Sequence, residues 1–281
     1  MVNSFYGWYL KCQSATQTLA LIPAVHKAGN KSTCSIQVIT DKDAWTVTFQ
    51  ADAFRRTGRN IVIGENRFGE KGIRLAIHTP QLTIKGKLEF GPLSPLKYDI
   101  MGPFTLIPFM ECRHSVWSMC HPVMGKLYIN GQKFSFQNSW GYWEGDRGRS
   151  FPKEYLWTQC CFEGGSMMLS VADIPMAGIH FTGIIGVILW QGREYRIATY
   201  LGARVARMRN KMVRVKQGNM ELEARLLGEA ERPLKAPVKG NMVRTIHESA
   251  SCRAFYRFCK KGCTLFAFET DRASFEYEYF T

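Results

Sequence analysis

The sequence lacks the helical periodicity that most mixed folds show, and this absence narrows the fold class. Apolar residues do not recur at the three- and four-residue spacing of an amphipathic helix over any long stretch. Short segments of alternating polar and apolar residues recur instead, separated by turn-forming residues such as Asn130–Gly131. This pattern predicts an all-β protein.

Long apolar runs and an export signal are also lacking. The most apolar stretch, Ile174–Trp190, contains Pro175, His180 and three glycines, and its length is short for a membrane span. Residues 1–8 show no basic segment followed by an apolar one, so no secretory signal is predicted. The nine cysteines are scattered and odd in number, which favours reduced thiols and a cytoplasmic location.

Negative charge is scarce: 23 Asp and Glu stand against 37 Lys and Arg, for a formal charge of +14. The densest basic stretch is Arg204–Lys216, in which basic residues alternate with apolar ones. That stretch fits a solvated strand face, a surface for an anionic ligand or membrane, or a nucleic-acid contact. Because no zinc finger, helix-turn-helix or RNP signature is present, we expect no nucleic-acid partner.

The two halves of the chain resemble each other. Tyr9–Cys12 precedes a strand that ends in Ile22–Pro23, and Tyr155–Leu156 precedes one that ends in Ile174–Pro175. An offset of about 150 residues is close to one domain. We therefore expect an internal duplication: two tandem lipocalin-like antiparallel β-barrels over residues 1–137 and 138–281. Barrels of this size hold one small apolar ligand.

One segment, residues 138–160, is rich in both aromatic and charged residues. It contains two carboxylates two positions apart, Glu144 and Asp146. Residues two apart on a strand share a face, and two close carboxylates in apolar surroundings keep one of them protonated. Such a group can donate a proton. Alternatively, the two acids pair with Arg147 and Arg149 and brace a loop between the domains.

The same segment resembles the tocopherol cyclase family, whose motif is rich in Trp, Gly and acidic residues. The matching positions are Tyr142, Glu144, Asp146, Gly148, Phe151, Pro152, Trp157, Gln159 and Cys160. Three further segments resemble sequences of that family: Phe5–Tyr9, Glu221–Arg225 and Pro233–Pro237. The chain departs from the motif where Arg147 and Tyr155 replace tryptophans.

The resemblance implies a cofactor-free intramolecular lyase of the isomerase class. Such an enzyme protonates a double bond of a prenylated hydrophobic substrate and so drives cyclisation or hydration in a pocket near the domain junction. Asp146 or Glu144 is the expected catalytic acid, with Asp146 ranked first. The expected ligand-binding residues in this segment are Tyr142, Trp143, Arg147, Phe151, Tyr155, Trp157 and Gln159.

Further polar residues are expected at the domain junction: Glu111, His114, Arg244 and Glu248. They extend the ligand site or form an internal salt-bridge network. The nearby residues Cys112, His114, Cys120 and His121 do not have the spacing of a known zinc site, so no metal is expected. The expected partner is a prenylated phenol, terpenoid or lipid, with peripheral contact to an anionic membrane surface.

Two readings without chemistry also fit these residues. In one, the protein is a lipocalin-like binder or carrier of a hydrophobic molecule. In the other, it is a duplicate whose pocket is filled by side chains. Only the enzyme reading requires one of the two paired acids to have a raised pKa.

Overall fold

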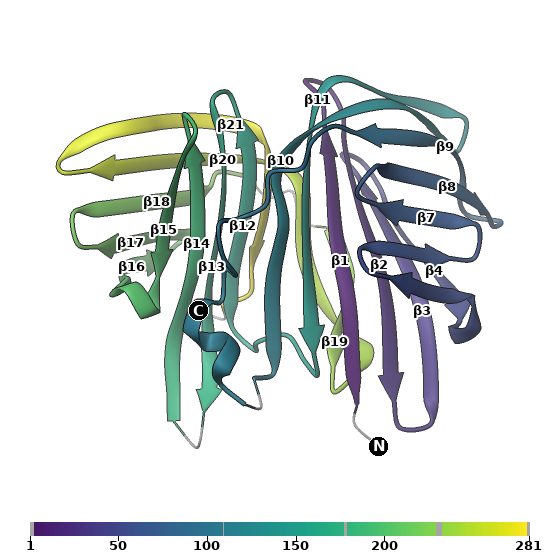
Figure 1. The fold of residues 1–281 in the computed structure, drawn as a ribbon, viewed down its shortest axis with the longest axis horizontal. Coiled ribbons are helices and arrows are strands. Elements are labelled where there is room, and N and C mark those ends of the chain that lie inside the picture. Colours follow the sequence, from purple (N-terminus) through teal and green to yellow (C-terminus); the bar gives the residue numbers. More distant parts are fainter. Residues whose placement is uncertain (1–2, 109, 177–178, 229–231, 280–281) are drawn as a thin grey trace. The chain divides into compact units, whose positions relative to one another are not determined.

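The computed structural model describes residues 3–108, 110–176, 179–228 and 232–279. These residues form 21 β-strands and three short 3-10 segments, which confirms the predicted all-β class (Figure 1). No helix among them has the length and apolar character that a membrane span requires.

The first sheet has eleven strands in the order β4-β3-β2-β1-β11-β10-β9-β8-β7-β6-β5. They are β1 (Ser4–Gln13), β2 (Thr18–Ala28), β3 (Lys31–Thr40), β4 (Ala44–Gln50), β5 (Phe54–Thr57), β6 (Asn60–Ile63), β7 (Asn66–Gly69), β8 (Gly72–His78), β9 (Thr83–Phe90), β10 (Cys112–Ile129) and β11 (Gln132–Gly148). The consecutive strands β4 and β5 lie at opposite ends of this order, yet only the 3-10 turn η1 (Ala51–Ala53) joins them. The sheet therefore curls into a nearly closed barrel.

The second sheet repeats this plan in the order β15-β14-β13-β12-β21-β20-β18-β17-β16, with β19 paired to β20. Its strands are β12 (Tyr155–Phe162), β13 (Gly165–Met176), β14 (Ile179–Trp190), β15 (Arg193–Ala198), β16 (Arg204–Arg209), β17 (Met212–Gln217), β18 (Met220–Leu226), β19 (Arg232–Val238), β20 (Asn241–Lys260) and β21 (Cys263–Tyr277). The turn η3 (Thr199–Leu201) joins the two edge strands β15 and β16. The side-chain amide of Gln217 in β17 bonds the backbone of Arg196 and Ala198 in β15.

The shared topology confirms the predicted duplication. Each sheet begins with a four-strand meander, β1–β4 or β12–β15, and its remaining strands return to the start. The last strand then pairs with the first, β11 with β1 and β21 with β12. A further 3-10 turn, η2 (Gly102–Leu106), lies before β10.

Each barrel is filled by its own apolar core. In β1, Trp8, Leu10 and Cys12 belong to the first core, together with Trp117 and Trp143. In the second barrel, Leu156 and Cys160 of β12 take the corresponding place. Because strand residues alternate between faces, the residues between these core positions project from the outer wall of each barrel.

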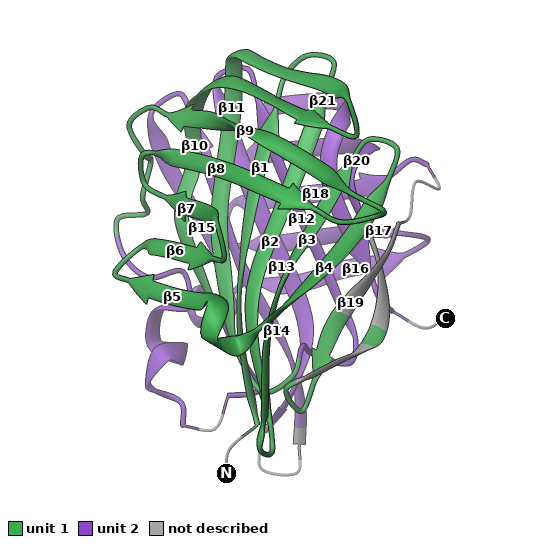
Figure 2. Ribbon diagram, turned by 90° about the vertical axis from the view of Figure 1, so that its right-hand side faces the viewer, with its two compact units in different colours: residues 1–97, 114–150, 235–244 green, residues 98–113, 151–234, 245–281 purple. Residues whose placement is uncertain are grey.

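The chain divides into two compact units (Figure 2). Unit 1 comprises residues 1–97, 114–150 and 235–244, and unit 2 comprises residues 98–113, 151–234 and 245–281. The boundary predicted after Gln137 falls inside β11, a strand that lies wholly within unit 1. A division into two domains near that residue stays a prediction.

Candidate functional site

Strand β11 places Tyr142, Glu144 and Asp146 on one face of the first barrel wall. The residue between two of them, Trp143, is fully buried in the barrel core, so the other three project from the outer wall. The two acids predicted to share a face therefore do so. Tyr9 of β1 lies directly opposite Glu144 in the strand register and extends the same face.

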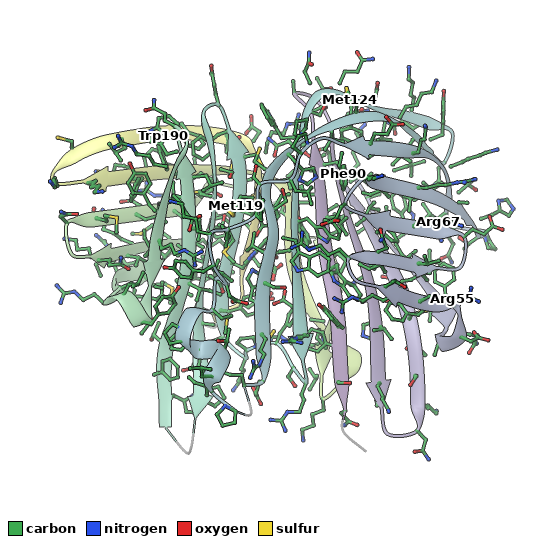
Figure 3. The ribbon with its side chains drawn as sticks, in the orientation of Figure 1. Arg55, Arg67, Phe90, Met119, Met124 and Trp190 are labelled. Carbon is green, nitrogen blue, oxygen red and sulfur yellow. The ribbon has the colours of Figure 1, made fainter. Side chains whose placement is uncertain are left out.

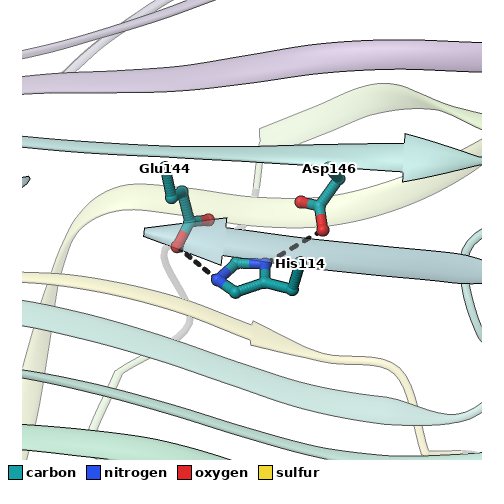
Figure 4. A group of neighbouring side chains, drawn as sticks. All are labelled: His114, Glu144 and Asp146. Carbon is teal, nitrogen blue, oxygen red and sulfur yellow. Dashed lines mark hydrogen bonds and ion pairs between the residues drawn. The ribbon is translucent and has the colours of Figure 1, made fainter. Parts of the chain in front are cut away.

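His114 of β10 lies between the two acids (Figure 4). Its Nδ1 is 2.9 Å from Oδ1 of Asp146, and its Nε2 is 3.1 Å from Oε2 of Glu144. The imidazole ring thus bridges two carboxylates that neighbour each other on one strand. All three residues belong to unit 1.

The two oxygens of Glu144 differ in their contacts. Oε2 accepts the hydroxyl hydrogen of Tyr142 and faces Nε2 of His114. Within the described residues neither group contacts Oε1. When Glu144 is neutral, a proton on Oε1 is therefore in neither contact and can be transferred to a substrate.

The local environment sets the protonation states. Burial raises the pKa of Glu144, which is 4% exposed, against the opposing effects of the His114 charge and the hydrogen bonds to His114 and Tyr142. Burial alone lowers the pKa of His114, but the charges of Glu144 and Asp146 and the hydrogen bonds to them raise it well above its ordinary value. A consistent state pairs imidazolium with the Asp146 carboxylate and leaves Glu144 neutral. Within the trio this state leaves no net charge.

His114, Glu144 and Asp146 are also a donor set that could hold a metal ion. The geometry does not suit one, however. A histidine binds a metal through one ring nitrogen, whereas here the two ring nitrogens have different carboxylate neighbours, at 2.9 and 3.1 Å. One ligand atom from each of the three residues lies within 4.8 Å of the other two, but the nearest carboxylate oxygens contact different ring nitrogens.

The remaining predicted residues of unit 1 are Trp143, Arg147 and Arg244. Trp143 is in the barrel core, on the opposite face of β11 from the acids. Arg147 is exposed and follows Asp146 directly, so it also points to the opposite face. Arg244 is half-buried in β20. Both acids contact His114.

The other predicted residues belong to unit 2. Tyr155, Trp157 and Gln159 alternate along β12 and are buried. Phe151 is half-buried with its ring 6.2 Å from that of Tyr155. Two acids complete the set. Glu111 is half-buried just before β10, and the backbone of Glu248 lies opposite Glu276, while the Glu248 side chain lies outside the described part of the structure.

Two residues on these faces are not predicted from the sequence. Lys11 of β1 is 1% exposed and lies opposite Tyr142 in the register, on the face that carries Glu144. In unit 2, the hydroxyl of Tyr155 donates to the buried carboxylate of Glu276. Each unit thus has a buried tyrosine–glutamate pair whose acid lies on the last strand of its sheet.

Comparison with known proteins identifies the fold. No family model matches the chain, and no curated protein sequence does. Among solved structures, CghA in complex with Sch210972 has a TM-score of 0.63 at 10% identity, covering 98% of this chain and 88% of that chain. Kievitone hydratase from Nectria haematococca has a TM-score of 0.57 at 8% identity, covering 98% and 89%.

An AttH protein from Nitrosomonas europaea is similar as well, with a TM-score of 0.57 at 11% identity and coverage of 100% and 93%. These likenesses extend over nearly the full length of both chains in each pair. At such low identity they establish the two-barrel, lipocalin-like fold alone.

Proposed function

We propose that this protein is an acid catalyst that protonates a carbon–carbon double bond of a hydrophobic, prenylated substrate. The observation that carries the proposal is the buried Glu144, held between Tyr142 and His114 with Oε1 free of both contacts. The resemblance of residues 138–160 to the tocopherol cyclase family supports a cyclisation. The similar fold of a protein named as a hydratase supports addition of water as the related alternative.

Glu144 is the better candidate for the acid on physical grounds. A general acid must be protonated at the working pH, and burial raises the pKa of Glu144. Asp146 is bonded to Nδ1 of His114 and is more exposed, with 22% of its side chain accessible against 5% for Glu144. Asp146 is therefore assigned the role of holding His114 in place as an imidazolium.

The first step transfers the proton of Glu144 Oε1 to the less substituted carbon of the double bond. The π electrons form the new C–H bond, a tertiary carbocation is left on the neighbouring carbon, and Glu144 becomes a carboxylate. That carboxylate is stabilised by the Tyr142 hydroxyl and by the positive charge of His114, which are already in place. The trio therefore needs no rearrangement during the step.

The second step closes the reaction. A phenol oxygen of the substrate attacks the carbocation, a C–O bond forms, and the phenol proton returns to Glu144. The acid is regenerated and the net reaction is an isomerisation, without a cofactor. If water attacks instead of the phenol, the same proton movements give a hydrated product.

The proposal is tested with a prenylated hydroquinone in deuterated buffer. We expect a chroman that is an isomer of the hydroquinone apart from one deuterium. That deuterium should lie on the ring carbon that was the protonated alkene carbon. Liquid chromatography with mass spectrometry gives the product mass, and NMR gives the deuterium position.

A carrier without chemistry gives a different result. It returns the hydroquinone unchanged, although the ligand still binds and quenches tryptophan fluorescence. Product without deuterium at that carbon would overturn proton transfer from an exchangeable acid.

A further inference from the structure

Four basic side chains form one row across the outer wall of the first barrel. In the strand register Arg67 of β7 lies opposite Arg74 of β8, Arg74 opposite Lys87 of β9, and Lys87 opposite Lys126 of β10. Neighbouring strands are about 4.8 Å apart. The four charges therefore form a nearly straight line over three strand spacings.

This row is poorly compensated. All four side chains are exposed, and only Lys87 has an acidic partner among the described residues, with Nζ 2.8 Å from Oε1 of Glu89. Like charges directly opposite each other destabilise a sheet. An external anion that lies along the row would remove this repulsion.

Two side chains with apolar groups flank Lys126, the end of the row, on β10. Met124 and Tyr128 lie two residues on either side of Lys126, so all three share a face. Their exposed fractions are 57% and 44%. Lys85 lies opposite Tyr128 and adds a fifth cation. Figure 3 labels Arg67 and Met124 on this barrel, and Figure 2 shows β7, β8 and β9 facing the viewer.

We propose that this basic face docks the protein onto an anionic phospholipid bilayer. The basic face is the surface formed by Arg67, Arg74, Lys85, Lys87, Met124, Lys126 and Tyr128. Its cations match anionic headgroups, while Met124 and Tyr128 reach the headgroup boundary, where a tyrosine places its ring in apolar surroundings and its hydroxyl in water.

A bilayer fits this face better than a nucleic acid does. A single strand is held mainly by several aromatic rings that stack on its bases, whereas the basic face has one exposed ring and an exposed thioether. Docking on a membrane also suits a protein whose proposed substrate dissolves in lipid. The docking is nevertheless independent of that reaction, because it is measured without substrate.

The test is sedimentation of the full chain with vesicles. We expect binding to phosphatidylcholine vesicles that contain phosphatidylglycerol, weak binding to pure phosphatidylcholine, and release by salt. The double variant Arg74→Gln, Lys126→Gln should lower the partition coefficient roughly 30-fold, because each cation near an anionic surface contributes about fivefold to binding. The double variant Met124→Ser, Tyr128→Ser should also weaken binding, at unchanged charge.

The matched control removes the same number of positive charges from a surface of unit 2. Arg204 and Arg209 are exposed on β16 of unit 2, and the variant Arg204→Gln, Arg209→Gln should bind vesicles as the unaltered protein does. An equal loss in both pairs would show that net charge alone is responsible and would overturn the proposal. Tighter binding to a single-stranded RNA oligonucleotide than to anionic vesicles would overturn it as well.

Discussion

His114 and Glu144 meet through Nε2 and Oε2 at 3.1 Å, although 29 residues separate them along the chain. The contact is possible because β10 and β11 are neighbours in the sheet and both side chains leave the outer wall of the same barrel. A buried acid beside an imidazolium has two accessible states, neutral or ionised, and burial favours the neutral one. In the proposed mechanism this relationship lets Glu144 donate a proton and stabilises its conjugate base in advance.

Replacing Glu144 by Gln should abolish turnover and leave ligand binding nearly intact. Glutamine keeps the size and the hydrogen-bond acceptor for Tyr142 but has no proton to give. We expect a loss of at least about 100-fold in kcat, the usual contribution of a general acid, with a change in Kd of less than about threefold. Single-turnover kinetics and fluorescence quenching measure the two quantities.

The matched variant Asp146→Asn should give a smaller loss, because it removes the charge that holds His114 in place and leaves the acid itself intact. Equal activity of both variants with the unaltered protein would contradict the carboxylic-acid mechanism. A larger loss in Asp146→Asn than in Glu144→Gln would transfer the role of acid to Asp146.

The strands could be predicted because local rules decide them. Asn130–Gly131 predicts a hairpin, and both residues adopt the positive φ angles, 47° and 81°, that such a turn requires. The shared face of Glu144 and Asp146 follows from the same period of two.

His114 as the partner of these acids could not be predicted, because it depends on how far β10 extends. The hairpin pattern marks only the last residues of β10, whereas the strand begins at Cys112. The burial of Lys11 could not be predicted from the sequence either. Apolar and more polar residues alternate over Trp8–Gln13, a pattern that predicts a solvent-exposed Lys11, whereas residues 8–13 are all buried and both faces of β1 are covered.

Replacing Tyr142 by Phe should shift the pH dependence of the reaction. Activity requires the protonated form of Glu144, so it is constant at low pH and falls as the pH rises through the pKa of that group, which burial places above its ordinary value. The Tyr142 hydroxyl stabilises the carboxylate. Without it the falling limb of the kcat profile should move to higher pH. A shift to lower pH would contradict the assignment of Glu144 as the acid.

Two buried histidines should make the fold sensitive to acid. Burial lowers the pKa of His26 and of His121 to about 4. The unfolded chain, with an ordinary pKa of 6.5, binds protons more readily than the folded one below that pH. Each group's contribution is therefore complete above pH 6.5 and is lost as the pH falls towards 4, by about 3 kcal/mol at most.

Thermal unfolding between these pH values measures the effect. The variant His26→Gln should flatten the acid limb of the Tm profile, while His78→Gln, a change at an exposed residue, should leave it unaltered. His114 acts in the opposite sense: its raised pKa gives stability that is present below pH 6.5 and lost as the pH rises through the folded value. An acid limb that persists unchanged in His26→Gln would contradict this account.

Replacing Gly141 by Ala should destabilise the first barrel. A Cβ on Gly141 would lie 2.2 Å from Nε2 of His121, far inside the contact distance. The ring cannot move away cheaply, because it is 1% exposed, its Nδ1 is 2.9 Å from Oγ of Ser118, and its centroid is 4.4 Å from that of Phe90. Overpacking of this kind costs about 1–3 kcal/mol, measured by urea unfolding.

A second glycine supplies the control, and a double variant tests the mechanism. At Gly7 the added Cβ meets only Cβ of Ala24, at an ordinary contact of 3.7 Å, so Gly7→Ala should leave stability unchanged or raise it slightly. Removing the obstructing ring should relieve the strain: Gly141→Ala with His121→Ala should cost less than the two single changes added together. Strict additivity would show that the ring and the new methyl group do not collide, and the loss at Gly141 would then arise from the backbone.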